Sequence, residues 1–163
     1  MLRCIRQNQH DPVNKKMSEA AEDGEIRYRK LSSYKYQLWE SYNRHIDLRP
    51  EQDIDTPYVA LSGDGRLTVK QSYAWDGPSG PAIDTKTFLR ASLVHDALYQ
   101  MMREELLDHR VHRKRADDLL KTMCLEDGMF VFRAWYAHLA LRLFGGRNAR
   151  PGKKARSKIF TAP

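Results

Sequence analysis

The segment 85–103, TKTFLRASLVHDALYQMMR, constrains the fold most strongly, because its apolar residues fall on nearly every face of a helix. A helix with that pattern is expected to be buried. Its middle nevertheless carries His95 and Asp96, which project about 100° apart around the helix axis. A buried carboxylate is costly unless it is paired or binds a cation, and a buried imidazole needs partners for its ring nitrogens. The fold must therefore supply partners for both side chains.

A second helix, predicted over 112–126, offers a partner for His95. Its apolar face consists of Ala116, Leu119, Leu120, Met123 and Cys124. Asp117 lies at the edge of this face, whereas Asp118 points toward solvent. His95 and Asp117 are 22 residues apart, enough for an antiparallel return, so Asp117 can reach His95. A histidine held by a carboxylate through one ring nitrogen can act as a general base through the other.

The loop 76–84, DGPSGPAID, precedes the first helix and contains two glycines and two prolines, which predict a rigid, irregular backbone. Its carbonyl groups can fold toward the helix. Together with the Asp96 carboxylate they would form a set of hard oxygen ligands suited to calcium. The alternative is a structural role, in which His95 and Asp96 tie the helix to loops or to arginine side chains.

The remaining pattern predicts strands first and helices afterwards. Stretches at 34–39, 58–61 and 67–69, with the turn sequence SGDG at 62–65, predict a small antiparallel sheet of about three to four strands within 26–75. A third helix fits 129–144 and ends at Gly145 and Gly146. We therefore expect an α+β fold with a three-helix core. Residues 1–24 are expected to be a disordered extension in which Met17 is an alternative start, 25–145 one domain, and 146–163 a disordered basic tail.

Composition excludes several classes of protein. A length of 163 residues fits one domain, and a hydrophobic content of 41% is enough for a core. No apolar run reaches the roughly 18 residues of a membrane span, and no signal peptide is evident, so we expect a soluble protein that is not secreted. Cys4 and Cys124 are too few for a disulfide framework and suit a reducing compartment. Cys124 is expected to belong to the core.

The net charge of +7 is concentrated at the two ends of the chain. Residues 145–163 contribute +6 and residues 1–16 contribute +3, which leaves −2 for the middle. Basic ends predict unspecific attraction to phosphate, in nucleic acid or in anionic lipid, with a merely solubilising tail as the alternative. No motif that reads bases accompanies them, so no specific nucleic-acid partner is expected.

Two further segments leave alternatives open. The third helix is apolar on most faces but contains Arg133, His138 and Arg142, and it is too short to span a bilayer. We expect it in the core, with a membrane surface or a partner protein as alternative positions. His109 and His112 have a spacing seen in transition-metal sites. Because residues 110–115 are mostly basic, a solvated loop between helices is the expected structure there.

Three motifs, DGPSGP, LVHDALY and RADDLL, resemble a domain of unknown function found in tailed phages and bacteria. Members of that domain share a D-x-x-S-x-P loop, an H-D-x-x-Y helix and a downstream A-D pair, and the resemblance covers about 70–145. It implies a phage protein in the virion or in the host cytoplasm. The matching positions are Asp76, Ser79, Pro81, His95, Asp96, Tyr99, Ala116 and Asp117.

The same order of loop and helices is similar to secreted phospholipase A(2), and especially to the parvovirus capsid phospholipase domain. In the roles implied by this resemblance, His95 activates a water molecule, Asp117 orients His95, and Tyr99 supports Asp117. The implied activity is hydrolysis of an ester bond in membrane phospholipid.

The resemblance also implies a calcium site. Asp96 would bind the ion, and Asp76, Gly77 and Gly80 would belong to the loop around it, so that calcium stabilises the oxyanion of the reaction. The chain departs from the secreted enzymes in its loop prolines and in lacking their disulfides. Two classes of function follow: a calcium-assisted phospholipid hydrolase, or a non-catalytic phage virion or accessory protein in which the His-Asp pair is structural.

Overall fold

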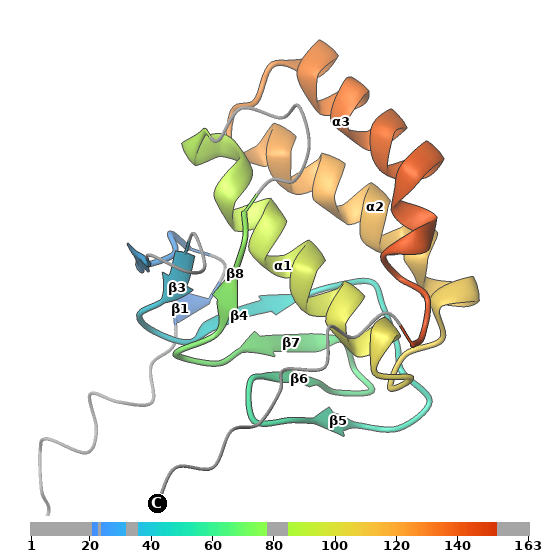
Figure 1. Ribbon diagram of the computed structural model, residues 1–163. Helices are drawn as coiled ribbons and strands as arrows, with labels where there is room; N and C mark the ends of the chain where they lie inside the picture. Colours follow the sequence, from blue (N-terminus) through green and yellow to red (C-terminus); the bar gives the residue numbers. More distant parts are fainter. Residues whose placement is uncertain (1–20, 23, 32–35, 78–84, 153–163) are drawn as a thin grey trace, which may run out of the picture.

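The computed structural model describes residues 21–22, 24–31, 36–77 and 85–152. Two small sheets are followed by three helices, so the predicted α+β fold with a three-helix C-terminal part is confirmed. Figure 1 shows α1 (Lys86–Arg103) next to the sheets, α2 (His109–Glu126) beside α1, and α3 (Val131–Phe144) on the outside. The expectations for residues 1–20, Gly80 and the tail from residue 153 onward lie outside the described residues.

The strands of the described residues are β1 (Ala21–Glu22), β2 (Tyr28–Lys30), β3 (Tyr36–Leu38), β4 (Tyr42–His45), β5 (Ile54–Asp55), β6 (Val59–Leu61), β7 (Arg66–Val69) and β8 (Ala74–Trp75). They form a five-stranded sheet in the order β1-β4-β7-β6-β5 and a three-stranded sheet in the order β2-β3-β8. Within 26–75 the pairing is antiparallel as predicted, but the number of strands was wrong, because seven short strands there belong to two sheets. The one parallel pair among the described strands, β1 with β4, involves residues before that range. Strands of two residues are too short to produce a recognisable alternation of apolar and polar residues.

The turn predicted at 62–65 does connect a hairpin, formed by β6 and β7. Leu61 and Leu67 face each other across it and are fully buried. The N–H of Gly65 donates to the carbonyl of Ser62 at 2.8 Å, and Gly65 has a φ of 90°. That left-handed conformation explains why glycine occupies this position.

Burial of α1 agrees with its apolar pattern. Twelve of its 18 residues are buried, so it contributes to the core on most of its faces. Trp75 of β8 donates from Nε1 to Oγ of Ser92 on α1 at 3.2 Å. The second helix begins three residues earlier than predicted, because the Asp108 side chain accepts a hydrogen bond from the N–H of Arg110 at 2.8 Å and caps it.

Ion pairs at the end of α2 fix the two inner helices against the five-stranded sheet. Arg44 of β4 donates to both carboxylate oxygens of Glu126 at 2.9 Å. Arg90 of α1 lies 2.7 Å from an oxygen of Asp127, just after α2. Because Arg44 and Arg90 are both largely buried, these pairs help to determine how α1 and α2 sit against each other.

The third helix ends before Gly145 as predicted, but its expected place in the core was wrong. It packs on α2, and Ala134 is the only buried residue of the helix. Apolar residues on most faces of a helix indicate that the helix is buried, but they do not indicate whether the same chain or another molecule buries it. No helix among the described residues is long and apolar enough to cross a membrane. The α3 apolar surface consists of the exposed side chains of Phe130, Val131, Phe132, Trp135, Tyr136, Leu139, Leu143 and Phe144.

Candidate functional site

His95 of α1 and Asp117 of α2 meet between the two helices. Nε2 of His95 lies 3.0 Å from Oδ1 of Asp117. The two residues are only 5% and 0% exposed, so the contact is withdrawn from bulk water. Each side chain projects from the middle of its helix, where the backbone is held on both sides by further turns. The contact that helix spacing predicted is present, and the catalytic roles assigned to the two residues stay predictions.

Two further side chains donate to the Asp117 carboxylate. The hydroxyl of Tyr99, one helical turn after His95, donates to Oδ1 at 2.7 Å. Nη1 of Arg113, one turn before Asp117, donates to Oδ2 at 3.4 Å. Burial raises the pKa of Tyr99 above its usual range, and the hydrogen bond to Asp117 raises it further, so Tyr99 remains a phenol donor. The carboxylate thus has donors on both oxygens.

Arg113 is the site residue that sequence analysis missed. It lay within the predicted helix 112–126, but it was grouped with the basic residues 110–115, for which a solvated loop was expected; α2 includes all of them. The available signal was the spacing of four residues between Arg113 and Asp117, which puts an arginine and an aspartate on the same helix face. Nη1 of Arg113 also donates to the Leu141 carbonyl of α3 at 3.4 Å. The same guanidinium group therefore contacts the Asp117 carboxylate and the end of α3.

The hydrogen bond to Asp117 determines which nitrogen of His95 is available for chemistry. A carboxylate can only accept a hydrogen bond, so the proton of a neutral His95 ring is assigned to Nε2. The lone pair of a neutral ring then lies on Nδ1. Within residues 85–152 and the described strands, no hydrogen bond is made to Nδ1. The arrangement leaves one ring nitrogen oriented by Asp117 and the other able to accept a proton.

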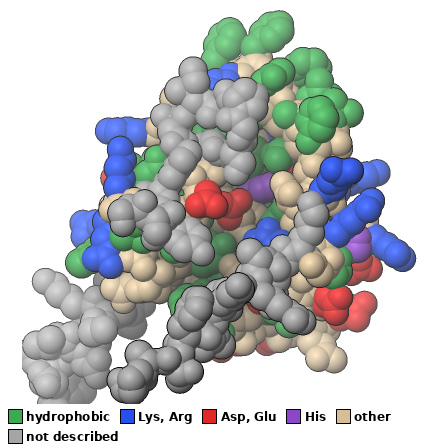
Figure 2. All heavy atoms as spheres, in the orientation of Figure 1, with side chains coloured by type: hydrophobic (Ala, Val, Ile, Leu, Met, Phe, Trp, Pro, Cys, Tyr) green, Lys and Arg blue, Asp and Glu red, His purple; other side chains and the backbone are tan. Residues whose placement is uncertain are grey.

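Asp96 has a different environment, although it is adjacent to His95. Its side chain is partly buried, and no hydrogen bond from another described residue reaches its carboxylate. Burial raises the pKa of Asp96 to about 6, and the negative charge of Asp76 acts in the same direction, while His95 and Arg103 partly offset the increase. Figure 2 shows acidic side chains beside a histidine in the middle of the visible face. A cation near Asp96 would relieve this unfavourable burial of charge.

The structure places the predicted loop residues only in part. Asp76 is exposed and lies near enough to Asp96 to raise its pKa. Gly77 is buried and has a φ of 71°, a conformation that favours glycine. Gly80 lies outside the described residues. No group of three or more His, Cys, Asp or Glu side chains suited to a metal ion is present in the part of the chain that is described. Calcium also uses backbone carbonyl oxygens, which such a group of side chains does not include.

The other residues considered as ligands or nucleophiles lie apart from this site. His109 and His112 lie in the first turn of α2, so the prediction of a solvated loop was wrong. His112 is buried, and burial lowers its pKa, as does the charge of Arg115. Cys124 is fully buried, and burial raises its pKa to about 12, which confirms it as a residue of the core.

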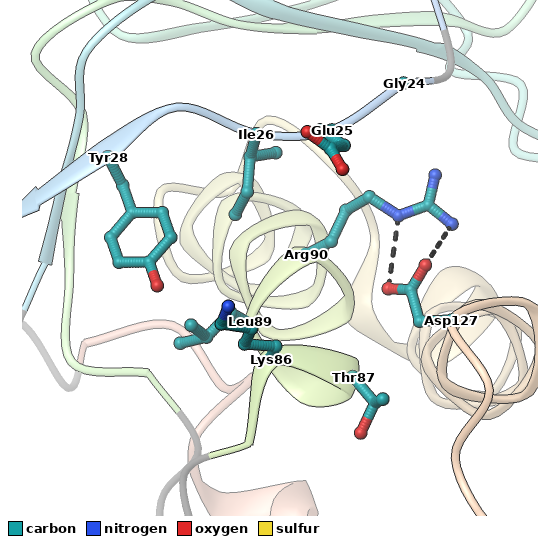
Figure 3. A pocket seen from close by; sticks show the side chains of 9 residues that line it. All are labelled: Gly24, Glu25, Ile26, Tyr28, Lys86, Thr87, Leu89, Arg90 and Asp127. Carbon is teal, nitrogen blue, oxygen red and sulfur yellow. Dashed lines mark hydrogen bonds and ion pairs between the residues drawn. The ribbon is translucent and has the colours of Figure 1, made fainter.

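A separate cleft of about 610 Å³ lies between the segment before β2 and the start of α1. Figure 3 shows Glu25 and Tyr28 on one side, Lys86 on the other, and the Arg90–Asp127 ion pair at the edge. None of the residues proposed for catalysis or calcium binding lines this cleft. It is therefore not the site that the sequence motifs indicate.

Residues 54–141, just over half of the chain, match a family described as protein of unknown function (DUF1353). The chain belongs to this family. The matched DUF1353 region contains all of α1 and α2, and with them His95, Asp96, Tyr99 and Asp117. The predicted resemblance to a domain of unknown function is thus confirmed. No significant match was found among curated proteins or among solved structures.

Asp117 and Asp118 offer a matched pair of substitutions on neighbouring positions. We expect Asp117→Ala to lower the free energy of unfolding by about 2–4 kcal/mol, because it leaves buried donors without an acceptor. Asp118 pairs with His138 and Arg142 near the surface, so Asp118→Ala is expected to cost about 1 kcal/mol or less. Chemical denaturation of both variants measures the difference, and equal losses would contradict the central place of Asp117.

Asp96→Asn tests the burial of the second carboxylate. The folded-state pKa of about 6 exceeds the ordinary value of 3.8, so the folded protein binds more protons than the unfolded chain between these values, and stability falls as the pH rises through that range. With chelator present, Asp96→Asn should therefore be more stable than the parent above about pH 6, on the order of 2 kcal/mol. The advantage should shrink below about pH 4, where the carboxyl is protonated in both states. Denaturation curves at several pH values check this, and a pH-independent difference would contradict it.

Proposed function

We propose that this DUF1353 chain is a phage-encoded, phospholipase A(2)-like hydrolase that cleaves an ester bond of membrane phospholipid with assistance from calcium. The observation that carries the proposal is the buried hydrogen-bonded group of His95, Asp117 and Tyr99, with Asp96 next to His95. The order of these residues along the chain is the one that the resemblance to phospholipase A(2) requires.

In the proposed reaction His95 is the general base. Nδ1 of His95 takes a proton from a water molecule whose oxygen attacks the ester carbonyl carbon. The bond from that carbon to the alcohol oxygen then breaks, and the proton passes from His95 to the leaving oxygen. The products are a fatty acid and a lysophospholipid. Asp117 holds the ring through Nε2 and stabilises the imidazolium that forms, while Tyr99 and Arg113 hold Asp117.

The residues around Asp96 fit a calcium ion. A desolvated carboxylate with a raised pKa, a second carboxylate on Asp76 and a buried glycine backbone at Gly77 supply the oxygen-rich, negatively charged surroundings that calcium prefers. Asp96 and Asp76 would hold the ion together with carbonyl groups of the loop. When bound, calcium would polarise the ester carbonyl and stabilise negative charge on its oxygen.

The origin and location belong to the same proposal. The three motifs of the loop and helices resemble those of a domain from tailed phages and bacteria, which supports a protein of the virion or the host cytoplasm. Phospholipid in a membrane is then the expected substrate surface, and other virion proteins are expected partners.

A second candidate is a non-catalytic virion or accessory protein. The contact of Arg113 with both the Asp117 carboxylate and the Leu141 carbonyl favours it, because this group of residues also holds the three helices together. In that case His95 and Asp117 would contribute to stability alone. The candidates differ in whether the folded parent protein hydrolyses phospholipid.

Release of fatty acid from vesicles of phosphatidylcholine and phosphatidylglycerol tests the proposal. We expect release with calcium and none with chelator, and a loss of at least about 100-fold in His95→Ala, the usual effect of removing a general base. The exposed His45 of β4 provides a matched control, because His45→Ala leaves the site intact. Circular dichroism and thermal unfolding of each variant report whether it remains folded.

Absence of release by the folded parent protein at any calcium concentration would reject the hydrolase and favour the second candidate. Release that His95→Ala retains would also reject the proposed base. Thermal unfolding with added calcium gives an independent measurement, since calcium should raise the Tm of the parent and not that of Asp96→Asn.

A further inference from the structure

The α3 apolar surface lies among the described residues that the proposed site does not use. Phe132 and Phe144 are each 75% exposed and Trp135 is 51% exposed, although such side chains are normally buried. Figure 2 shows hydrophobic side chains crowding the upper part of the visible face, where Figure 1 places α3. A group of exposed large apolar side chains on one helix is typical of a docking surface.

The patch also contains a shallow depression that α2 and α3 form together. It has a volume of about 330 Å³ and is lined by Lys121, Val131, Phe132 and Trp135. Lys121 places a positive charge next to three apolar side chains. An aromatic and basic rim around an apolar depression is suited to the boundary between lipid headgroups and acyl chains.

Charge identifies what covers this surface. From Gly128 to the end, the chain contains eight lysine and arginine residues and no aspartate or glutamate. Arg133, Arg142, Arg147 and Arg150 belong to the described part of this segment. Asp118 of α2 reaches toward α3, but it is paired with His138 and Arg142. Basic residues next to apolar side chains are complementary to an occupant that combines an apolar interior with negative charge at its surface.

We propose that the α3 apolar surface binds an anionic phospholipid membrane, with α3 lying in the plane of the interface. Aromatic and aliphatic side chains would enter the boundary of the acyl chains, while Lys121 beside α3 and Arg147 and Arg150 after it would contact lipid phosphates. A second copy of this chain fits less well, because two such faces would bring like charges together. Nucleic acid would leave the apolar side chains uncovered.

The position of α3 connects this surface to the proposed site. Arg113 donates to the Asp117 carboxylate and to the backbone carbonyl of Leu141, so it connects the site to the helix that carries the surface. Next to α3, a Cβ added at Gly145 would lie only 2.9 Å from the hydroxyl of Tyr99. The inference rests on the proposed function, because the membrane would present the phospholipid substrate. Membrane binding itself can be measured whether or not hydrolysis occurs.

Tryptophan fluorescence of the full chain tests the proposal directly. Trp39 and Trp135 are about equally exposed, at 52% and 51%, whereas Trp75 is buried. With chelator present, vesicles of phosphatidylcholine and phosphatidylglycerol should shift the emission to shorter wavelength, and phosphatidylcholine alone should have much less effect. Trp39→Phe should retain this shift and Trp135→Phe should lose it.

Two variants measure the energetic contribution of the apolar side chains. The double substitution Phe132→Ser and Phe144→Ser should weaken co-sedimentation with the anionic vesicles by at least about tenfold, because it removes two large side chains from the lipid. Both positions are exposed, so the variant should unfold at nearly the parental temperature. Tyr58 lies just before β6 and is 49% exposed, so Tyr58→Ser should bind to the vesicles as the parent does.

Several outcomes would overturn the proposal. Absence of a shift with either kind of vesicle, or a shift that survives in Trp135→Phe, would exclude α3 as the membrane surface. Equal binding to neutral and anionic vesicles would exclude a contribution of the basic residues to membrane binding. A blue-shifted Trp135 together with a dimer in sedimentation without vesicles would assign the surface to a second copy. Binding by His95→Ala without hydrolysis by the parent would support the inference and reject the hydrolase.

Discussion

The buried carboxylate of Asp117 is the constraint on which the rest of the helical part depends. With 0% of its surface exposed, it must find its hydrogen-bond donors inside the protein. His95 and Tyr99 from α1 and Arg113 from its own helix supply them. These contacts set the rotation of α1 against α2, and Arg113 extends them to α3. A single acidic side chain thus links all three helices and orients the imidazole of His95.

Asp117 and Asp96 show how two carboxylates near one histidine acquire different properties. Asp117 is surrounded by donors, and its carboxylate contacts both His95 and Tyr99. Asp96 is desolvated and lies near Asp76, so its pKa is raised to about 6. The first environment suits orientation of a base, and the second suits a cation. Such a division of roles by environment supports the proposed hydrolase.

The contacts of the candidate site could be predicted from the sequence better than the short strands and the exposure of α3. His95 and Asp117 were found because helix periodicity indicates direction and because buried polar groups require partners. Arg113 was missed because it was grouped with its basic neighbours, although it lay within the predicted helix four residues before Asp117. The two-residue strands were not predicted, because pairing in a sheet depends on residues far apart in sequence. The exposure of α3 was not predicted, because an apolar pattern does not identify the molecule that covers the helix.

A general base at Nδ1 of His95 requires that the proton of the neutral ring is on Nε2, so the position of this proton is the property to measure. Long-range proton–nitrogen NMR spectra at alkaline pH distinguish the two ring nitrogens. Comparison with His95→Gln assigns the signals. We expect a protonated Nε2, hydrogen-bonded to Asp117, and an unprotonated Nδ1. A proton on Nδ1 would contradict it, because that nitrogen could then not accept a proton from water.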